Sequence, residues 1–150
     1  LPTVRFEKTK GFYDTSRLGD LLYVFHKNHK IYLNNALLKH GISLIQVLCI
    51  IMIYTGDELN QKDLADGLYL SKGAITKAIN KLEKNSYVTR EKLKEDKRQY
   101  ILKLTPKGES IIPLIEEINN EWEKKMDFKN LNPEFYETFK QLTAKSIDLN

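Results

Sequence analysis

Polar side chains of the kinds that contact nucleic acids recur between residues 71 and 84 of this chain. Thr and Asn side chains can hydrogen-bond to base edges, whereas Lys side chains neutralise phosphates and can donate to guanine. Apolar residues recur at helical spacing from Ile75 to Leu82, so the polar residues fall on the other side of the same helix. The candidate contact residues on that side are Ser71, Lys72, Gly73, Thr76, Lys77, Asn80 and Lys81, with Lys84 further along. Gly73 lacks a side chain, which would let the first turn approach a phosphate.

A second charged segment follows in EKLKEDKRQYILKLT, residues 91–105. Near its end Tyr100, Leu102 and Leu104 alternate with Ile101 and Lys103, which is typical of a β-strand. The charged residues before that strand therefore form the tip of a predicted hairpin. A solvated loop is the simplest interpretation, but basic side chains at such a tip can also bind DNA. The candidate DNA-binding residues of the hairpin are Arg90, Lys92, Lys94, Asp96, Lys97 and Arg98.

Positive charge is concentrated in these two segments. Residues 71–104 contain ten Lys or Arg against four Asp or Glu, whereas residues 105–150 contain six against nine. The net charge of the whole 150-residue chain is only +4, so the uneven distribution is more informative than the total. A basic block of this kind is typical of a protein that binds nucleic acid or another anionic surface. The alternative is chance clustering on a solvated face.

The helices that must position these residues can be predicted from capping patterns. Asn60 and Asp63 resemble a capping box at the start of a short helix, which we expect Asp66-Gly67 to end. Ser71 is the expected cap of the next helix, and Asn85-Ser86 ends it. Two short helices joined by a tight turn, the second of them basic, predict a helix-turn-helix. Residues 87–104 then form the two strands around the charged tip.

Two helices are expected before this motif. The first is capped by one of the residues 14–16 (Asp, Thr, Ser) and ends at Gly41. The second starts near Ser43 and is apolar on nearly every side, which predicts that it lies in the middle of a core.

Two further helices are expected after the hairpin. Thr105-Pro106 starts a long one, in which Pro113 predicts a kink. Asn132-Pro133 starts the last helix, and we expect its inner face to carry Phe135, Phe139 and Leu142. The predicted order is α-α-α-α-β-β-α-α, which is a mainly α protein with a two-stranded β wing.

The segment NQKDLADGLYLSKGAITKAINKLEKNSYVTREKLKEDKRQYILKLTPKGESII resembles the winged helix-turn-helix of the MarR family of bacterial and archaeal transcription regulators. Its most specific parts are LSKGAITKAINKLEKNSYV, EDKRQYILKLT and TPKG, and the resemblance is good over residues 43–115. It implies a winged helix-turn-helix DNA-binding domain at residues 43–105 and a helical dimerisation region from residues 1–42 and 106–150. It also implies a homodimer that binds a palindromic operator in double-stranded DNA. The usual role in the family is a repressor released by a small phenolic or carboxylate ligand.

The resemblance also implies roles for single residues. Arg98 corresponds to a wing arginine that enters the minor groove, where a narrow groove concentrates negative potential. Asp96 corresponds to the acid that orients it, as a carboxylate can hold a guanidinium by two hydrogen bonds. The ligand pocket is expected where the dimerisation helices meet the winged domain. Candidate pocket residues are Lys27, His29, Lys30 and Tyr32, unless these simply form a solvated helix face.

Other chemistry is less well supported by the sequence. Cys49 could be a redox sensor, but it lies in an apolar helix where a thiol is buried and inert. His26 and His29 could share a metal, but no third ligand lies at a suitable spacing, so we expect no metal and no cofactor. No nucleophile motif or phosphate-binding loop is present, which argues against an enzyme. The remaining alternative is a winged-helix module that binds protein and not DNA.

Composition indicates the compartment. A single cysteine cannot form an intramolecular disulfide, which fits a reducing cytoplasm. The longest apolar run, residues 47–54, is too short to span a bilayer, and residues 1–10 contain no apolar signal-peptide core. We therefore expect a cytoplasmic protein without a membrane partner.

Overall fold

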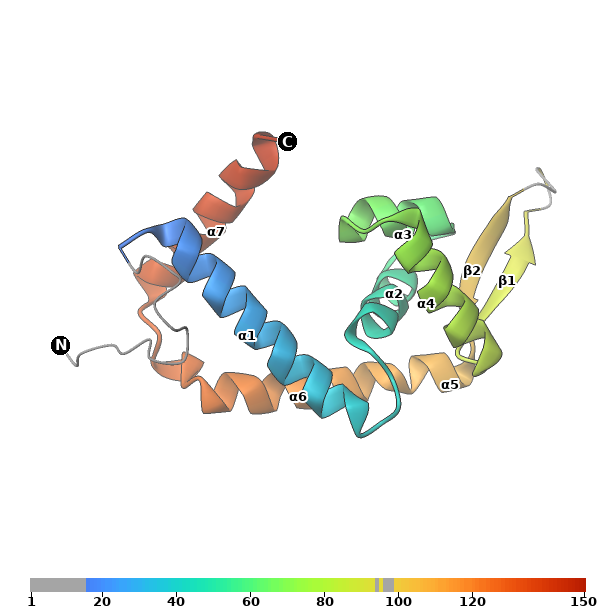
Figure 1. Ribbon diagram of the computed structural model, residues 1–150, viewed down its shortest axis with the longest axis horizontal. Helices are drawn as coiled ribbons and strands as arrows, with labels where there is room; N and C mark the ends of the chain where they lie inside the picture. The colour runs from blue at the N-terminus through green and yellow to red at the C-terminus, as the bar shows by residue number, and fades with distance from the viewer. Residues whose placement is uncertain (1–15, 94, 96–98) are drawn as a thin grey trace. The chain divides into compact units, whose positions relative to one another are not determined.

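The computed structural model describes residues 16–93, 95 and 99–150. It is mainly helical with one two-stranded antiparallel sheet in the described part, as the sequence predicts (Figure 1). The elements are α1 (Leu18–Leu38), α2 (Leu44–Thr55), α3 (Gln61–Leu68), α4 (Lys72–Lys84), β1 (Val88–Lys92), β2 (Tyr100–Leu104), α5 (Pro106–Glu109), α6 (Ile111–Lys125), the 3₁₀ helix η2 (Phe128–Asn130) and α7 (Pro133–Asp148). The chain divides into two compact units, Leu1–Ile112 and Pro113–Asn150.

Helix α2 forms the centre of the first unit, as its all-round apolar sequence predicts. Val47, Cys49 and Ile50 are at most 1% exposed, and α2 contacts α1, α3, α4, β2 and α5. Ser43 caps the helix: its hydroxyl accepts from the Gln46 backbone N–H at 3.3 Å, and the Gln46 side chain accepts from the Ser43 N–H at 3.1 Å. This reciprocal pair explains why the polar Gln46 side chain is buried in an otherwise apolar core.

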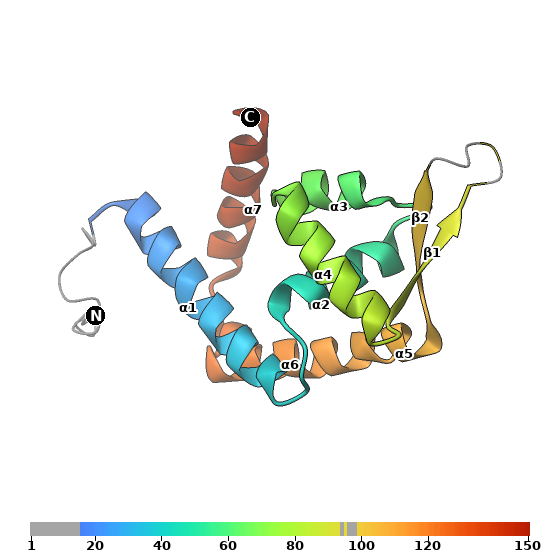
Figure 2. The same ribbon diagram turned by 45° about the vertical axis from the view of Figure 1, so that its right-hand side comes forward.

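Helices α3 and α4 form the predicted helix-turn-helix and lie side by side in both views (Figures 1 and 2). The Asn60–Asp63 capping box at α3 and the Ser71 cap of α4 are confirmed. The predicted end of α3 is wrong, because the helix continues through Gly67 to Leu68 and Tyr69 takes the left-handed conformation. Gly67 instead permits close packing, since a Cβ there would lie 2.5 Å from the Met52 methyl carbon.

Strands β1 and β2 pair antiparallel, with Val88 opposite Leu104, Arg90 opposite Leu102 and Lys92 opposite Tyr100. Val88, Ile101 and Leu102 are buried and fix the hairpin to the core. The Leu102 N–H donates to the Leu59 carbonyl at 2.8 Å, which ties β2 to the segment before α3. The hairpin is therefore anchored at its base on two sides.

The long helix predicted to kink at Pro113 is instead interrupted earlier. Thr105 caps it with Pro106 in the first turn as expected, but α5 ends at Glu109 and α6 begins at Ile111. Pro113 thus lies in the first turn of α6, where a missing N–H costs nothing because that N–H has no intrahelical acceptor. The proline starts a new helix and does not bend an existing one.

The ends of the chain differ in part from expectation. Arg17 occupies the N-cap position of α1 without a capping side-chain hydrogen bond, so Ser16 is not its cap, and residues 14 and 15 lie outside the described part. Gly41 lies in the left-handed region with φ of 69°, consistent with the predicted stop. Asn132 caps α7 as predicted, but no residue of α7 is buried, and its expected inner face is 41–56% exposed in the single chain.

Candidate nucleic-acid interface

The polar face of α4 is solvent-exposed along its length. Ile75, Ala78, Ile79 and Leu82 are all buried on the opposite side, so the core determines which residues face outward. The predicted contact residues are exposed without exception: Ser71, Lys72, Gly73, Thr76, Lys77, Asn80 and Lys81. Ser71 serves first as the N-cap, because its hydroxyl accepts from the Ala74 N–H at 3.1 Å. At Gly73 a Cβ would meet nothing within 4 Å, so the first turn of α4 is open to a ligand.

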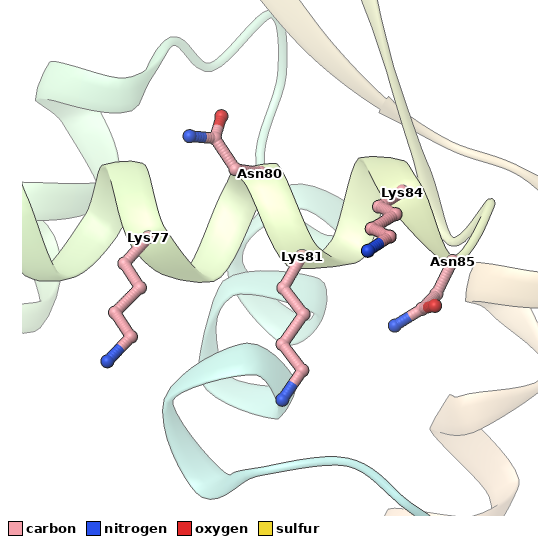
Figure 3. A pocket seen from close by; sticks show the side chains of 5 residues that line it. All are labelled: Lys77, Asn80, Lys81, Lys84 and Asn85. Atoms are coloured by element: carbon pink, nitrogen blue, oxygen red, sulfur yellow. The ribbon is translucent and has the colours of Figure 1, made fainter.

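One side of this face is a row of lysines. A shallow open hollow beside α4 is lined by Lys77, Asn80, Lys81, Lys84 and Asn85. Figure 3 shows the Lys77 and Lys81 side chains extending to the same side of the helix, whereas Asn80 points away from them. Ammonium groups one helical turn apart suit successive negative groups such as phosphates. The sequence predicts Asn85 only as the end of this helix, which the structure confirms, and not as a lining residue of the hollow.

The other side of the face connects α4 to the hairpin. An Arg90 terminal amino group donates to the Asn80 Oδ1 at 2.7 Å. The Arg90 Nε lies 3.3 Å from the Glu83 carboxylate, an ion-pair contact without the alignment of a hydrogen bond. Arg90 is thus directed toward α4, although the sequence placed it among the DNA-binding residues of the wing.

Thr76 also has a partner within the protein. Its hydroxyl accepts from the Gln61 side-chain amide at 3.1 Å, which joins the first residue of α3 to α4. Both predicted base-reading residues, Thr76 and Asn80, are therefore held by side chains of neighbouring elements. Gln61 and the contact between Glu83 and Arg90 were missed at the sequence level, because only the fold brings α3 and β1 beside α4.

The hairpin is fixed to the end of α4 through the TPKG segment. The Thr105 hydroxyl donates to the Ser86 carbonyl at 2.6 Å, and the Thr105 N–H donates to the Tyr87 carbonyl at 3.1 Å. Lys107 donates to the Asn85 carbonyl at 2.8 Å and lies 4.5 Å from the centre of the Tyr87 ring. These contacts fix the orientation of β1 and β2 relative to α4.

The tip of the hairpin is only partly described. Lys92 is exposed, and its ammonium lies 5.6 Å from the centre of the Tyr100 ring. The other four predicted wing residues, Lys94, Asp96, Lys97 and Arg98, lie outside the described residues.

The candidate pocket residues all lie on α1. Lys27 and Lys30 are exposed, whereas His29 and Tyr32 are half-buried. The pKa of His29 is lowered, first by burial and second by the neighbouring His26, so its neutral form is favoured. The hollow beside α4 and a second one near Tyr54 and Lys103 include none of the four.

The structure also locates the cysteine and the histidines that the sequence raised as redox or metal candidates. Cys49 is 0% exposed, and burial raises the pKa of its thiol to about 11. No group of three His, Cys, Asp or Glu among the described residues could hold a metal ion. No helix in residues 16–93 or 99–150 is long and apolar enough to cross a bilayer.

The sequence is similar to a known protein family and to individual transcriptional regulators. The sequence pattern of the MarR family matches residues 42–100, which contain the helix-turn-helix, β1 and the first residue of β2. The HTH-type transcriptional regulator SarZ of Staphylococcus haemolyticus is 32% identical over 112 residues, 75% of this chain and 76% of SarZ. The HTH-type transcriptional regulator BilQ of Clostridium symbiosum is 28% identical over 120 residues, 80% of this chain and 78% of BilQ.

Solved structures share the fold over most of the chain. A MarR transcriptional regulator from Methanosarcina mazei Go1 superposes with a TM-score of 0.77 at 26% identity, covering 89% of this chain and 98% of that protein. The S. aureus MepR–DNA complex has a TM-score of 0.77 at 20% identity, covering 88% of this chain and 95% of MepR. At that identity the second likeness concerns the fold alone.

Proposed function

The chain belongs to the MarR family of transcriptional regulators, and from that premise we propose that it binds double-stranded DNA sequence-specifically as a homodimer. The observation that carries the proposal is the exposed Lys, Thr and Asn face of α4 opposite a buried apolar stripe. A helix with this division can lie in the major groove, with its lysines on phosphates and its amides and hydroxyls on base edges. As a member of a family of regulators, the protein is not an enzyme.

The wing belongs to the same proposal. Arg98 is its minor-groove residue and Asp96 its orienter, by resemblance to the family, and Lys92, Lys94 and Lys97 add positive charge around them. Arg90 supports the recognition helix as well as adding charge, because it binds Asn80 and Glu83. The proposed DNA-binding domain comprises residues 43–105.

Dimerisation is assigned to residues 1–42 and 106–150. In support, α1 exposes Leu22 (40%) and Phe25 (46%), and α7 exposes Phe135 (56%) and Phe139 (41%). Large apolar side chains gathered on two helices are the usual mark of a protein interface. A second copy of the chain is the occupant that fits a palindromic operator, because protein symmetry and operator symmetry then match.

Regulation is proposed to follow the family pattern: repression, released by a small phenolic or carboxylate ligand. Lys27, His29, Lys30 and Tyr32 on α1 offer cationic and aromatic side chains for such a ligand. The test is titration of the preformed protein–DNA complex with an aromatic carboxylate such as benzoate. The assignment would be supported if benzoate released DNA from the parent protein at concentrations that leave the complex of Lys27→Ala with DNA intact.

The test of DNA binding is a gel-shift assay at two salt concentrations, with DNA from upstream of the protein's own gene. Binding to a palindrome should weaken steeply with salt, with log K falling by about 0.9 per phosphate neutralised for each unit of log salt. Binding to no palindromic DNA, or a salt-insensitive complex, would favour the protein-binding alternative. Against that alternative, the α4 face offers lysines and no exposed aromatic or aliphatic anchor.

A further inference from the structure

The contact between Arg90 and Asn80 has a defined chemical direction. A guanidinium has only donors, so the Asn80 atom that lies 2.7 Å from it must be the amide oxygen and not the amide nitrogen. The Glu83 carboxylate, 3.3 Å from the Arg90 Nε, holds the guanidinium from the same helix as Asn80. The orientation of the Asn80 amide is therefore set by the hairpin strand β1.

This orientation limits what Asn80 can recognise. An Asn reads adenine in the major groove with both ends of its amide, by accepting from N6 and donating to N7. Arg90 uses one of the two lone pairs of the Asn80 oxygen and turns that oxygen toward β1, so the two N–H donors are the groups best placed to face a base. Guanine offers two acceptors, N7 and O6, and thymine offers O4. Adenine offers only N7, beside an N6 donor that opposes another donor, and cytosine offers a donor.

We propose that Arg90 is a specificity-determining positioning residue that biases Asn80 toward donation, so that the base pair facing Asn80 is read through guanine or thymine acceptors in preference to adenine. The inference rests on the proposed DNA binding and adds a base preference to it. The Arg90 side chain is 28% exposed and that of Glu83 is 45% exposed. Ion pairs this accessible contribute little to stability, so their removal should report on recognition more than on folding.

The test is a randomised-site selection with the full-length dimer, followed by sequencing of the bound DNA. Asn80→Ala identifies the base pair that faces Asn80, because the base preference should disappear at that position of the DNA site. Arg90→Met frees the amide oxygen while keeping an aliphatic stem, and should raise the ratio of adenine to guanine at that position by about five- to a hundredfold, the range of one bidentate contact. Asn80→Asp keeps an oxygen for Arg90 but removes the donors, and should shift the preference to cytosine, whose N4 donates to carboxylates.

Lys92→Met is the matched control, because it removes one positive charge from the same strand but from a side chain that lies over Tyr100. It should weaken binding to all sequences without altering preference at a single position. Thermal unfolding of each variant shows whether it is folded. If Arg90→Met does not fold, the base preference of Asn80→Asp tests the inference instead.

The outcomes separate this inference from the function on which it rests. If the parent protein selects a palindrome but Arg90→Met and Asn80→Asp keep its base preference, or adenine is already preferred facing Asn80, the inference is overturned and DNA binding stands. The inference is likewise overturned, and DNA binding stands, if Asn80→Ala alters the base preference at no position of the site. If the parent protein selects no sequence at all, the proposed function fails and the inference with it.

Discussion

At the residue scale, Lys77 and Lys81 have the simplest proposed role, since both ammonium groups extend from the same side of α4. Lys77→Ala and Lys81→Ala should weaken binding to all DNA sequences alike. Each should also reduce the slope of log K against log salt by about 0.9, because one phosphate contact is lost. Titrations at several salt concentrations measure this slope.

An exposed lysine elsewhere supplies the control for this effect. Lys124 lies on α6, and Lys124→Ala removes the same charge outside the proposed interface. Its salt slope should equal that of the parent protein. A slope reduced equally by all three substitutions would indicate a general charge effect and contradict a localised phosphate contact.

Cys49 allows a prediction about reactivity. Its side chain is completely buried and the pKa of the thiol is raised to about 11, so the reactive thiolate is scarce at pH 8. Iodoacetamide should modify the protein within minutes in denaturant but not in the native state, as measured by mass spectrometry. Rapid modification of the native protein would contradict the burial and reopen a redox role.

The raised pKa of Cys49 also affects stability at high pH. The ordinary value is 9.0 and the folded value about 11, so between these the unfolded thiol loses its proton first. The folded state then binds more protons, and the free energy of unfolding falls as pH rises. Cys49→Ala should show a smaller loss of stability between pH 9 and 11 than the parent protein.

At the scale of elements, the TPKG segment holds the hairpin to the end of α4, and Gly108 makes this possible. A Cβ at Gly108 would collide with the Tyr87 carbonyl oxygen, which also accepts from the Thr105 N–H. Gly108→Ala should therefore destabilise the protein by about 1–3 kcal/mol, the usual cost of overpacking. Urea unfolding monitored by circular dichroism measures the change.

Gly73→Ala is the matched substitution in open space. No atom lies within 4 Å of a Cβ there, so alanine should leave stability unchanged or raise it by up to about 1 kcal/mol through helix propensity. If the first turn of α4 approaches a phosphate, the same substitution should weaken DNA binding. Equal stability losses at Gly108 and Gly73 would contradict the packing account.

At the scale of the whole molecule, the exposed apolar face of α7 predicts that the working unit is a dimer. Phe139 is 41% and Leu142 45% exposed, although both are large and apolar. Phe139→Lys and Leu142→Lys should shift the protein toward monomer at micromolar concentration, because a buried unpartnered charge is costly. Sedimentation velocity measures the distribution.

Ala144 provides the control on the same helix. It is exposed and lies on the opposite side of α7 from Phe139 and Leu142, so Ala144→Lys should leave the dimer intact. A parent protein that sediments as a stable folded monomer, or an Ala144→Lys variant that dissociates as readily as Leu142→Lys, would rule out this face as the interface.

The sequence by itself determined the features that depend on near neighbours along the chain. Asn60, Ser71, Thr105 and Asn132 all cap helices as predicted, because a capping side chain bonds within a few residues of its own position, and α2 starts beside Ser43 as expected. The buried stripe of α4 and the pairing of β1 with β2 also follow from local periodicity. These features were enough to predict the fold and the exposed face of the recognition helix.

Only the tertiary structure decided which side chains meet across elements. Asn80 and Arg90 are ten residues apart and Thr76 and Gln61 fifteen, so no helical or strand period relates the members of either pair. Likewise, Gly67 looks like a helix end in sequence, but it lies within α3, and the end of the Met52 side chain from another helix packs against it. Such contacts depend on how α2, α3, α4 and β1 pack, and packing involves residues distant in sequence whose partners no local pattern specifies.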